Sequence, residues 1–302
     1  MRFIPLARIT TVVALSSIGF TGISTGLAAA DAGGGGHVLY SSVVTDPTVN
    51  NLPSYGAEAY AFNEFGNEIT LGQSNGKGAT TNSAVLQLSS WACQSGSWNL
   101  GGCTTTPGAT YSMPITLNIY NSPAVGSYTP GSLIASVTQT FAVPYRPSST
   151  PDACAGDASE WSNGTTCYHG LLSSVTFKLH AVAVPPTFVY GISYNTSSFG
   201  PSPLGHSNPC NSTSAGCFYD SLNIALSQDP TNVSVGTDTQ PGTVFQNSSL
   251  AGEYCDAGAA GTGTYRLDSP NAPSCWGTTI PYSASPYYVP AIKFMSNSDS
   301  TH

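Results

Sequence analysis

Charged side chains are scarce in this sequence. Lys, Arg, Asp and Glu together make up 7% of its 302 residues. An amphipathic helix needs a charged face toward water, so this scarcity excludes a coiled coil or a helical protein with an ordinary charged surface. The chain is 40% hydrophobic, and its apolar residues recur in short runs, which excludes a disordered chain. The composition is typical of a secreted β-protein whose surface is solvated by Ser, Thr, Asn and Gln.

Basic residues are scarcer still. Beyond residue 30 the chain keeps five basic side chains against fifteen acidic ones, a formal charge of −10. Scattered cations cannot form the basic face that neutralises phosphates, and an acidic chain is repelled by anionic lipid. We therefore expect neither nucleic acid nor a membrane as a partner. The five basic residues are Lys77, Arg146, Lys178, Arg266 and Lys293.

Long hydrophobic runs are also missing. Arg2 and Arg8 give a positive start, Ile9–Phe20 is the longest apolar stretch, and Ala28-Ala29-Ala30 forms a cleavage site of small residues. Such a stretch is shorter than the roughly 20 residues that span a bilayer, so a secretory signal over residues 1–30 is expected instead of an anchor. We expect a Gly-rich leader over 31–36, one β-sandwich domain over 37–296 and a polar tail over 297–302. A domain boundary within Pro144–Gly170 is the alternative.

Eight cysteines follow the predicted signal, an even number suited to an oxidising compartment. No C-x-x-C or H-E-x-x-H motif occurs, which disfavours a zinc site. Eight cysteines allow 105 pairings, and the sequence does not choose among them. Pairing in chain order would close four short loops rich in Gly, Ser, Thr or Asn. These pairs are Cys93 with Cys103, Cys154 with Cys167, Cys210 with Cys217, and Cys255 with Cys275.

Short β-branched or aromatic runs alternate with Pro and Gly from residue 37 onward. Val175–His180 and Ile115–Tyr120 show period two, which places Phe177 and Leu179 inward on a half-buried strand. No helical pattern is long enough to cover parallel crossovers. We therefore expect an all-β, antiparallel, two-sheet sandwich of jelly-roll kind with long disulfide-pinned loops. The predicted strands are His37–Ser42, Ala57–Phe62, Glu68–Leu71, Ser83–Ser90, Pro114–Tyr120, Leu133–Val143, Leu172–His180, Phe188–Tyr194, Ser221–Ser227, Thr243–Phe245 and Ala291–Met295.

Several of these segments carry a family resemblance. They are Phe65–Leu71, Leu88–Trp91, Pro114–Tyr120, Pro130–Gly131, Gln139–Phe141, Tyr190–Thr196 and Tyr219–Leu226. They resemble a group of secreted bacterial β-sandwich proteins of uncharacterised function. The resemblance implies the fold and secretion to the extracellular space, and it brings no catalytic residues.

Two carboxylates are candidate catalytic groups. Glu64 and Glu68 flank Phe65-Gly66-Asn67, a sequence typical of a turn between strands. Glycoside hydrolysis needs two carboxyl groups about 5–10 Å apart, one as acid and one as base or nucleophile. A strand-turn-strand arrangement is compatible with that spacing. It is equally compatible with acids that face solvent at a turn.

Three of the four tryptophans are candidate ligand-binding groups. Trp98 and Trp161 lie inside predicted cysteine loops, and Trp276 follows Cys275. An exposed indole can stack on the apolar face of a sugar ring without any charge. The alternative is that these rings pack against a disulfide or cap the core. Trp91 ends an alternating strand and is expected in the core.

Asp152, Asp157 and Glu160 gather in the Cys154–Cys167 loop and are candidate calcium ligands. Their spacing is not that of an EF-hand, and a solvated acidic loop is the alternative reading. No cofactor is expected.

The composition and the aromatic loops together favour a secreted, non-catalytic extracellular module. Polysaccharide or cell-wall glycan is its expected partner, bound through the loop aromatics. The alternatives are a hydrolase that uses Glu64 and Glu68, and a purely structural envelope or matrix protein.

Overall fold

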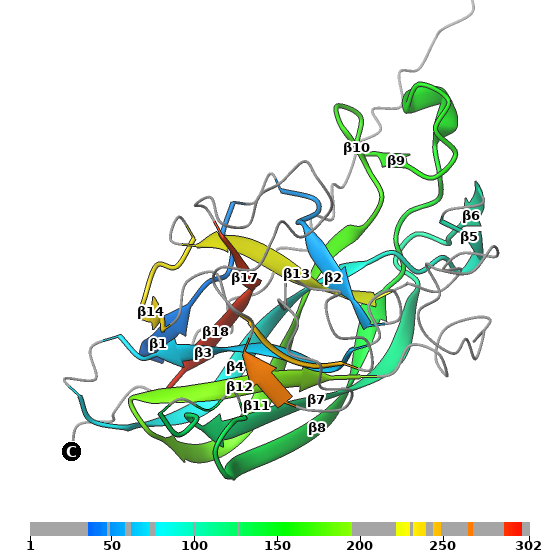
Figure 1. The fold of residues 1–302 in the computed structure, drawn as a ribbon. Coiled ribbons are helices and arrows are strands. Elements are labelled where there is room, and N and C mark those ends of the chain that lie inside the picture. Colours follow the sequence, from blue (N-terminus) through cyan, green and yellow to red (C-terminus); the bar gives the residue numbers. More distant parts are fainter. Residues whose placement is uncertain are drawn as a thin grey trace, which may run out of the picture. The chain divides into compact units, whose positions relative to one another are not determined.

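β-Strands dominate the described part of the chain, as the predicted all-β class requires (Figure 1). The structure is a computed structural model and describes residues 36–46, 49–57, 62–72, 76–98, 101–125, 127, 129–194, 222–229, 232–239, 244–248, 265–267 and 287–297. The chain divides into two units, Met1–Gly33 and Gly34–His302, and every described residue belongs to the second unit. Within these ranges a short 3-10 turn, η1 (Pro151–Ala153), accompanies the strands.

The first large sheet contains seven strands arranged around the long strand β4. One edge of β4 pairs with β11. Its other edge pairs with β18 and, closer to the C-terminal end of β4, with β13. All of these pairings are antiparallel. The strands are β1 (Val38–Ser41), β18 (Ile292–Met295), β4 (Ala79–Ser90), β13 (Leu222–Asp229), β17 (Tyr287–Pro290), β11 (Leu171–Val184) and β2 (Ser54–Gly56).

The second large sheet also contains seven strands, again with antiparallel pairing. Its order begins at β16 (Tyr265–Leu267) and continues through β15 (Phe245–Ser248), β3 (Phe62–Thr70), β12 (Thr187–Ser193), β7 (Thr110–Asn121) and β8 (Leu133–Pro144), with β14 (Thr237–Asp238) beside β3. Two small hairpins complete the described structure: β5 (Ser95–Ser97) with β6 (Gly101–Thr104), and β9 (Trp161–Ser162) with β10 (Cys167–Tyr168).

Both large sheets contribute side chains to one buried core. The period-two prediction for β11 is confirmed, because Val175, Phe177 and Leu179 are buried while the residues between them are exposed. Rings from the two sheets meet in this core. Phe141 of β8 lies 4.9 Å from Phe177, measured between ring centroids. This apolar contact between sheets is the main source of stability for a protein with so few charges.

The predicted turn between Glu64 and Glu68 is wrong. β3 runs without interruption from Phe62 to Thr70, and its residues Phe65 to Thr70 pair with β12. A Cβ atom on Gly66 would collide with the backbone carbonyl of Tyr190 on β12. Gly66 therefore allows the backbones of β3 and β12 to approach each other closely within the sheet. Glycine occurs at such close contacts as well as in turns, so a glycine alone does not distinguish the two.

The two sheets also touch along one side, where β8 and β11 lie next to each other (Figure 1). The side-chain amide of Gln139 donates to the Lys178 carbonyl at 2.9 Å and accepts from the Lys178 N–H at 3.3 Å. Just beyond this point β11 bulges, and His180 and Ala181 take φ values of 50° and 64°. We refer to this contact between β8 and β11 as the Gln139 seam.

Two of the four predicted cysteine pairs are confirmed. Cys93–Cys103 and Cys154–Cys167 are disulfides with Cα separations of 5.4 and 5.8 Å. Disulfides are typical of extracellular proteins. The described residues include no helix long and apolar enough to cross a bilayer. The other predicted pairs, Cys210 with Cys217 and Cys255 with Cys275, lie outside the described residues.

Candidate functional site

A pocket of 490 Å³ lies between the disulfide-closed loop and one end of the first sheet. Its volume falls within the range of about 300–1,000 Å³ that is typical of small-ligand sites. Its wall combines aromatic rings with a few polar side chains. The lining residues are Asn51, Leu52, Pro53, Ser54, Trp91, Glu160, Cys167, Tyr168, His169, Leu226 and Tyr288.

Trp91 follows the last residue of β4, and a chain of hydrogen bonds fixes its ring. Its indole N–H donates to Ser89 Oγ at 2.8 Å, and the Ser89 hydroxyl donates to Asn51 Oδ1 at 2.6 Å. A Cβ atom on Gly170 would lie 2.5 Å from the Trp91 indole nitrogen, so only glycine allows the ring to sit there. The Asn51 amide nitrogen donates no hydrogen bond within the described part of the chain. Trp91 and Asn51 are thus positioned in advance of any ligand.

Other rings support Trp91. His169 stacks on it with ring centroids 5.4 Å apart and planes inclined by 21°. Trp98 meets it edge to face, with centroids 4.5 Å apart. Such aromatic pairs add about 0.5–1.5 kcal/mol beyond their buried area. The aromatic wall is therefore a packed group and not a set of independent loop side chains.

Arg146 organises the backbone behind the pocket. Its buried guanidinium donates to the carbonyls of Ser159 and Pro147 and to the hydroxyl of Ser149. Its own backbone N–H donates to the Ala92 carbonyl, one residue beyond Trp91. Burial lowers the pKa of Arg146 to about 10, although the nearby carboxylates of Glu160 and Asp157 oppose this shift. Arg146 thus joins the Cys154–Cys167 loop to the end of β4.

A second group of polar contacts anchors His169. Its Nδ1 lies 3.2 Å from Ser159 Oγ, and that oxygen lies 2.6 Å from Asp157 Oδ1. Asp157 also accepts from the Ser159 backbone N–H at 2.7 Å. The hydrogen bond from the Ser159 hydroxyl is the largest cause, followed by the backbone bond, of an Asp157 pKa below its ordinary value. The His169 ring is consequently held from its Nδ1 side, and its Nε2 side is left toward Glu160.

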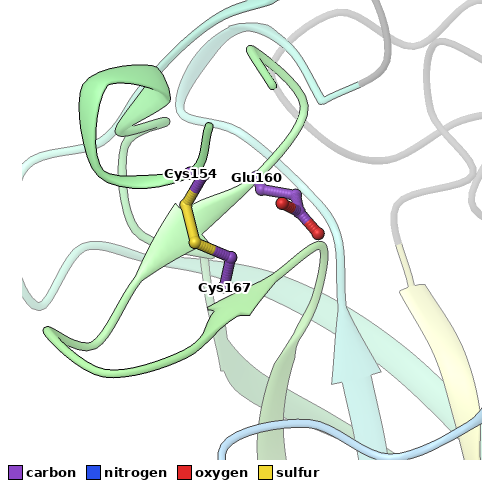
Figure 2. A group of neighbouring side chains, drawn as sticks. All are labelled: Cys154, Glu160 and Cys167. Carbon is purple, nitrogen blue, oxygen red and sulfur yellow. A yellow bond between two sulfur atoms is a disulfide. The ribbon is translucent and has the colours of Figure 1, made fainter. Parts of the chain in front are cut away.

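Glu160 lies beside the Cys154–Cys167 disulfide (Figure 2). Its Oε1 is 3.7 Å from His169 Nε2, and its side chain is 24% exposed. Within the described residues its carboxylate accepts no hydrogen bond. A carboxylate on the pocket wall with no close donor is available to a ligand.

The predicted tryptophan platforms have different environments. Trp161 is 6% exposed, donates its N–H to the Gly170 carbonyl at 2.9 Å and packs on Tyr168. It therefore supports the pocket from behind. Trp98 is half-buried and packs on Trp91 without lining the pocket itself. Its indole N–H finds no acceptor among the described residues. Trp276 lies outside the described residues. Trp91, which was expected in the core, lines the pocket instead.

The candidate catalytic pair lies elsewhere. Glu64 and Glu68 sit on one face of β3, with Cα atoms about 13 Å apart at roughly 3.3 Å per strand residue, and both are buried. Glu64 accepts from the Asn118 amide at 2.9 Å and from the Tyr120 hydroxyl at 3.1 Å. Neither side chain lines the pocket.

The candidate calcium ligands are also not gathered. Among the described residues, the group with three potential ligand atoms within 4.8 Å of one another is Cys154, Glu160 and Cys167 (Figure 2). Its two sulfur atoms are joined in a disulfide, so they are not thiolate ligands. Asp157 is occupied by Ser159, and Asp152 is exposed in η1. Glu160 alone of the three predicted ligands faces the pocket.

Several residues of the pocket were missed by the sequence analysis. His169 and Tyr168 directly follow Cys167, and Trp91 precedes Cys93 by two residues. An aromatic residue or histidine next to a disulfide is the signal that could have found them, since the bridge fixes the backbone on which they stand. Asn51 and Tyr288 carry no such signal. They reach the pocket only through the pairing of distant strands.

Comparison with family models, curated proteins and solved structures finds no match to this chain. The resemblance to secreted bacterial β-sandwich proteins accordingly remains a prediction.

Proposed function

We propose that this protein is a secreted, non-catalytic module that binds carbohydrate in the pocket around Trp91. We further propose that the two large sheets form a jelly-roll-like sandwich, with the disulfide-pinned loops presenting the site. One buried core shared by two antiparallel sheets supports the architecture. Two loop disulfides support export.

The observation that carries the binding function is the composition of the pocket wall. Trp91, Tyr168 and Tyr288 offer aromatic surface, while Asn51 and Ser54 offer polar groups beside them. Sugar rings present both an apolar C–H face and hydroxyl groups, so such a wall matches both. The ring of Trp91 is already fixed by Ser89 and Gly170, which lowers the entropy cost of binding.

A binding role is better supported than hydrolysis. The described lining of the pocket contains one carboxylate, Glu160, whereas glycoside hydrolysis uses two. A purely structural role does not account for a pocket whose aromatic and polar side chains are already fixed in position.

Co-sedimentation with a panel of insoluble polysaccharides tests the proposal. The exported protein should bind at least one of them, and Trp91→Ala should reduce that affinity by roughly tenfold or more, since the main aromatic face is lost. Leu133→Ala is the matched control, because it removes an exposed apolar side chain that does not line the pocket. No binding to any polysaccharide, or an equal loss in both variants, would reject the proposal. Release of soluble sugars during the assay would instead indicate a hydrolase.

A further inference from the structure

The proposed glycan ligand has one further property, and the pocket wall indicates it. Glu160 carries a negative charge at the pocket, and its carboxylate accepts no hydrogen bond within the described part of the chain. His169 Nε2 lies 3.7 Å from Glu160 Oε1, which is too far for a hydrogen bond. Because Ser159 holds the Nδ1 side of the same ring and Trp91 stacks on its face, His169 is not free to turn and complete that contact.

The other charged groups near Glu160 are already engaged. The Arg146 guanidinium uses its three nitrogens on Ser159, Pro147 and Ser149, so it compensates Glu160 only from a distance. Asp157 accepts from Ser159 and adds further negative charge on this side of the loop. A donor that binds Glu160 strongly must therefore come with the ligand.

A cation that enters this pocket meets two favourable partners. A carboxylate forms short, charge-assisted hydrogen bonds with an ammonium group. Trp91, Tyr168 and Tyr288 give the pocket aromatic surface, and aromatic rings attract a cation through their quadrupoles. An acetylated amine offers neither the charge nor the extra donors, and a negatively charged sugar would be repelled.

Building on the proposed carbohydrate-binding function, we propose that the ligand is an amino-sugar polymer with free, protonated amino groups, selected by Glu160. The neutral part of each sugar lies on the aromatic wall, as in the proposed function. The ammonium group is bound by the Glu160 carboxylate. The acidic balance of the chain beyond residue 30 favours the approach of such a polycation.

Calorimetric titration with two oligosaccharides of equal length tests this proposal, one of β-linked glucosamine and one of its N-acetylated form. The titration is run at a pH of about 5.5, where the sugar amine is protonated. The wild-type protein should bind the free amine about tenfold more tightly. Glu160→Gln should remove this preference and leave binding of the acetylated form unchanged. Asp152→Asn is the matched control, because it deletes an exposed carboxylate of the adjoining turn η1 that does not line the pocket.

Each alternative result is informative. Equal affinity of the wild-type protein for both oligosaccharides overturns the selection of an amine, while binding lost in Trp91→Ala still supports the carbohydrate site. This comparison changes only the ligand, so it does not depend on the folding of any variant. An equal loss of preference in Asp152→Asn and Glu160→Gln overturns the proposal in favour of general charge attraction. Failure to bind either oligosaccharide or any polysaccharide rejects both proposals together.

Discussion

Glu64 and Glu160 are both acidic residues in a chain with few charges, but the burial and the hydrogen bonding of their carboxylates are opposite. Glu64 is 1% exposed on the second sheet, and Asn118 and Tyr120 donate to it. Gly191, on the neighbouring strand, leaves room for it, because a Cβ there would meet the Glu64 carboxylate carbon at 2.5 Å. Glu160 lies on a disulfide-closed loop, is partly exposed and receives no hydrogen bond from the described residues.

The difference shows why conspicuous charge is a poor guide to function. A buried carboxylate persists only with donors around it, and those donors make it part of the structure. A carboxylate left without donors at a pocket contributes little to stability and stays available for a ligand. The sequence presents both residues alike, and only their surroundings separate them.

Removal of each carboxylate tests the comparison most strongly. Glu64→Ala should lower the free energy of unfolding by about 4 kcal/mol, because it leaves two donors unsatisfied in a buried cavity. Glu160→Ala should change it by less than about 0.5 kcal/mol, as expected for a partly exposed charge. Urea unfolding of the two variants measures both values. Similar losses in the two variants would mean that Glu160 is structural.

The loop region should depend on Arg146 more than on its acidic residues. Arg146→Met should cost about 2–3 kcal/mol, because the carbonyls of Ser159 and Pro147 lose their buried donor. Amide hydrogen exchange should locate the loss in residues 146–170 and leave β4 and β7 protected. Lys178→Met is the control, since its exposed side chain should have almost no effect. A uniform loss of protection would contradict the separation of the two regions.

The smallest expected change in the free energy of unfolding concerns the buried core between the sheets, and it is a gain instead of a loss. Tyr190 is fully buried, and its hydroxyl has no hydrogen-bond partner among the described residues. Tyr190→Phe should therefore raise the free energy of unfolding by about 1 kcal/mol. Burial, with smaller contributions from Tyr40 and Asp238, raises the pKa of Tyr190 well above its ordinary value.

This pKa shift also predicts a dependence on pH. Above pH 10 or so, the unfolded state loses the Tyr190 proton while the folded state keeps it, so the wild-type protein loses stability there. The advantage of Tyr190→Phe should therefore widen as the pH rises above 10. Arg146 acts in the opposite direction, but it is present in both proteins and cancels in the difference. Thermal unfolding of both proteins at increasing alkaline pH measures this, and a constant difference would refute it.

Local pattern determined how much of the fold could be predicted. The alternation of Val175, Phe177 and Leu179 correctly placed one face of β11, because the side-chain period of a strand is a local property. The short loops rich in polar residues correctly indicated two disulfides. Gly66 misled the prediction of β3, since glycine serves turns and close strand contacts alike.

The candidate site was harder to predict because distant segments build it. Asn51, Trp91 and Tyr288 meet only after strands far apart in the chain have paired. Trp91 ends an apolar strand, so its pattern indicated the core, and no local signal reveals that Gly170 holds its ring at the pocket. The structural role of Arg146 could not be predicted either, because its acceptors are mainly backbone carbonyls, which any residue supplies.

The Gln139 seam bears on how this protein behaves among copies of itself. A border strand with unused N–H and C=O groups is a template for fibril growth, and many proteins guard such borders with charge. Here an uncharged glutamine occupies both backbone groups of Lys178, and the bulge at His180 and Ala181 bends the chain immediately afterwards. The Gln139 contact and the bulge thus protect this border by geometry, because they leave no straight, unpaired stretch of backbone there for another copy to extend.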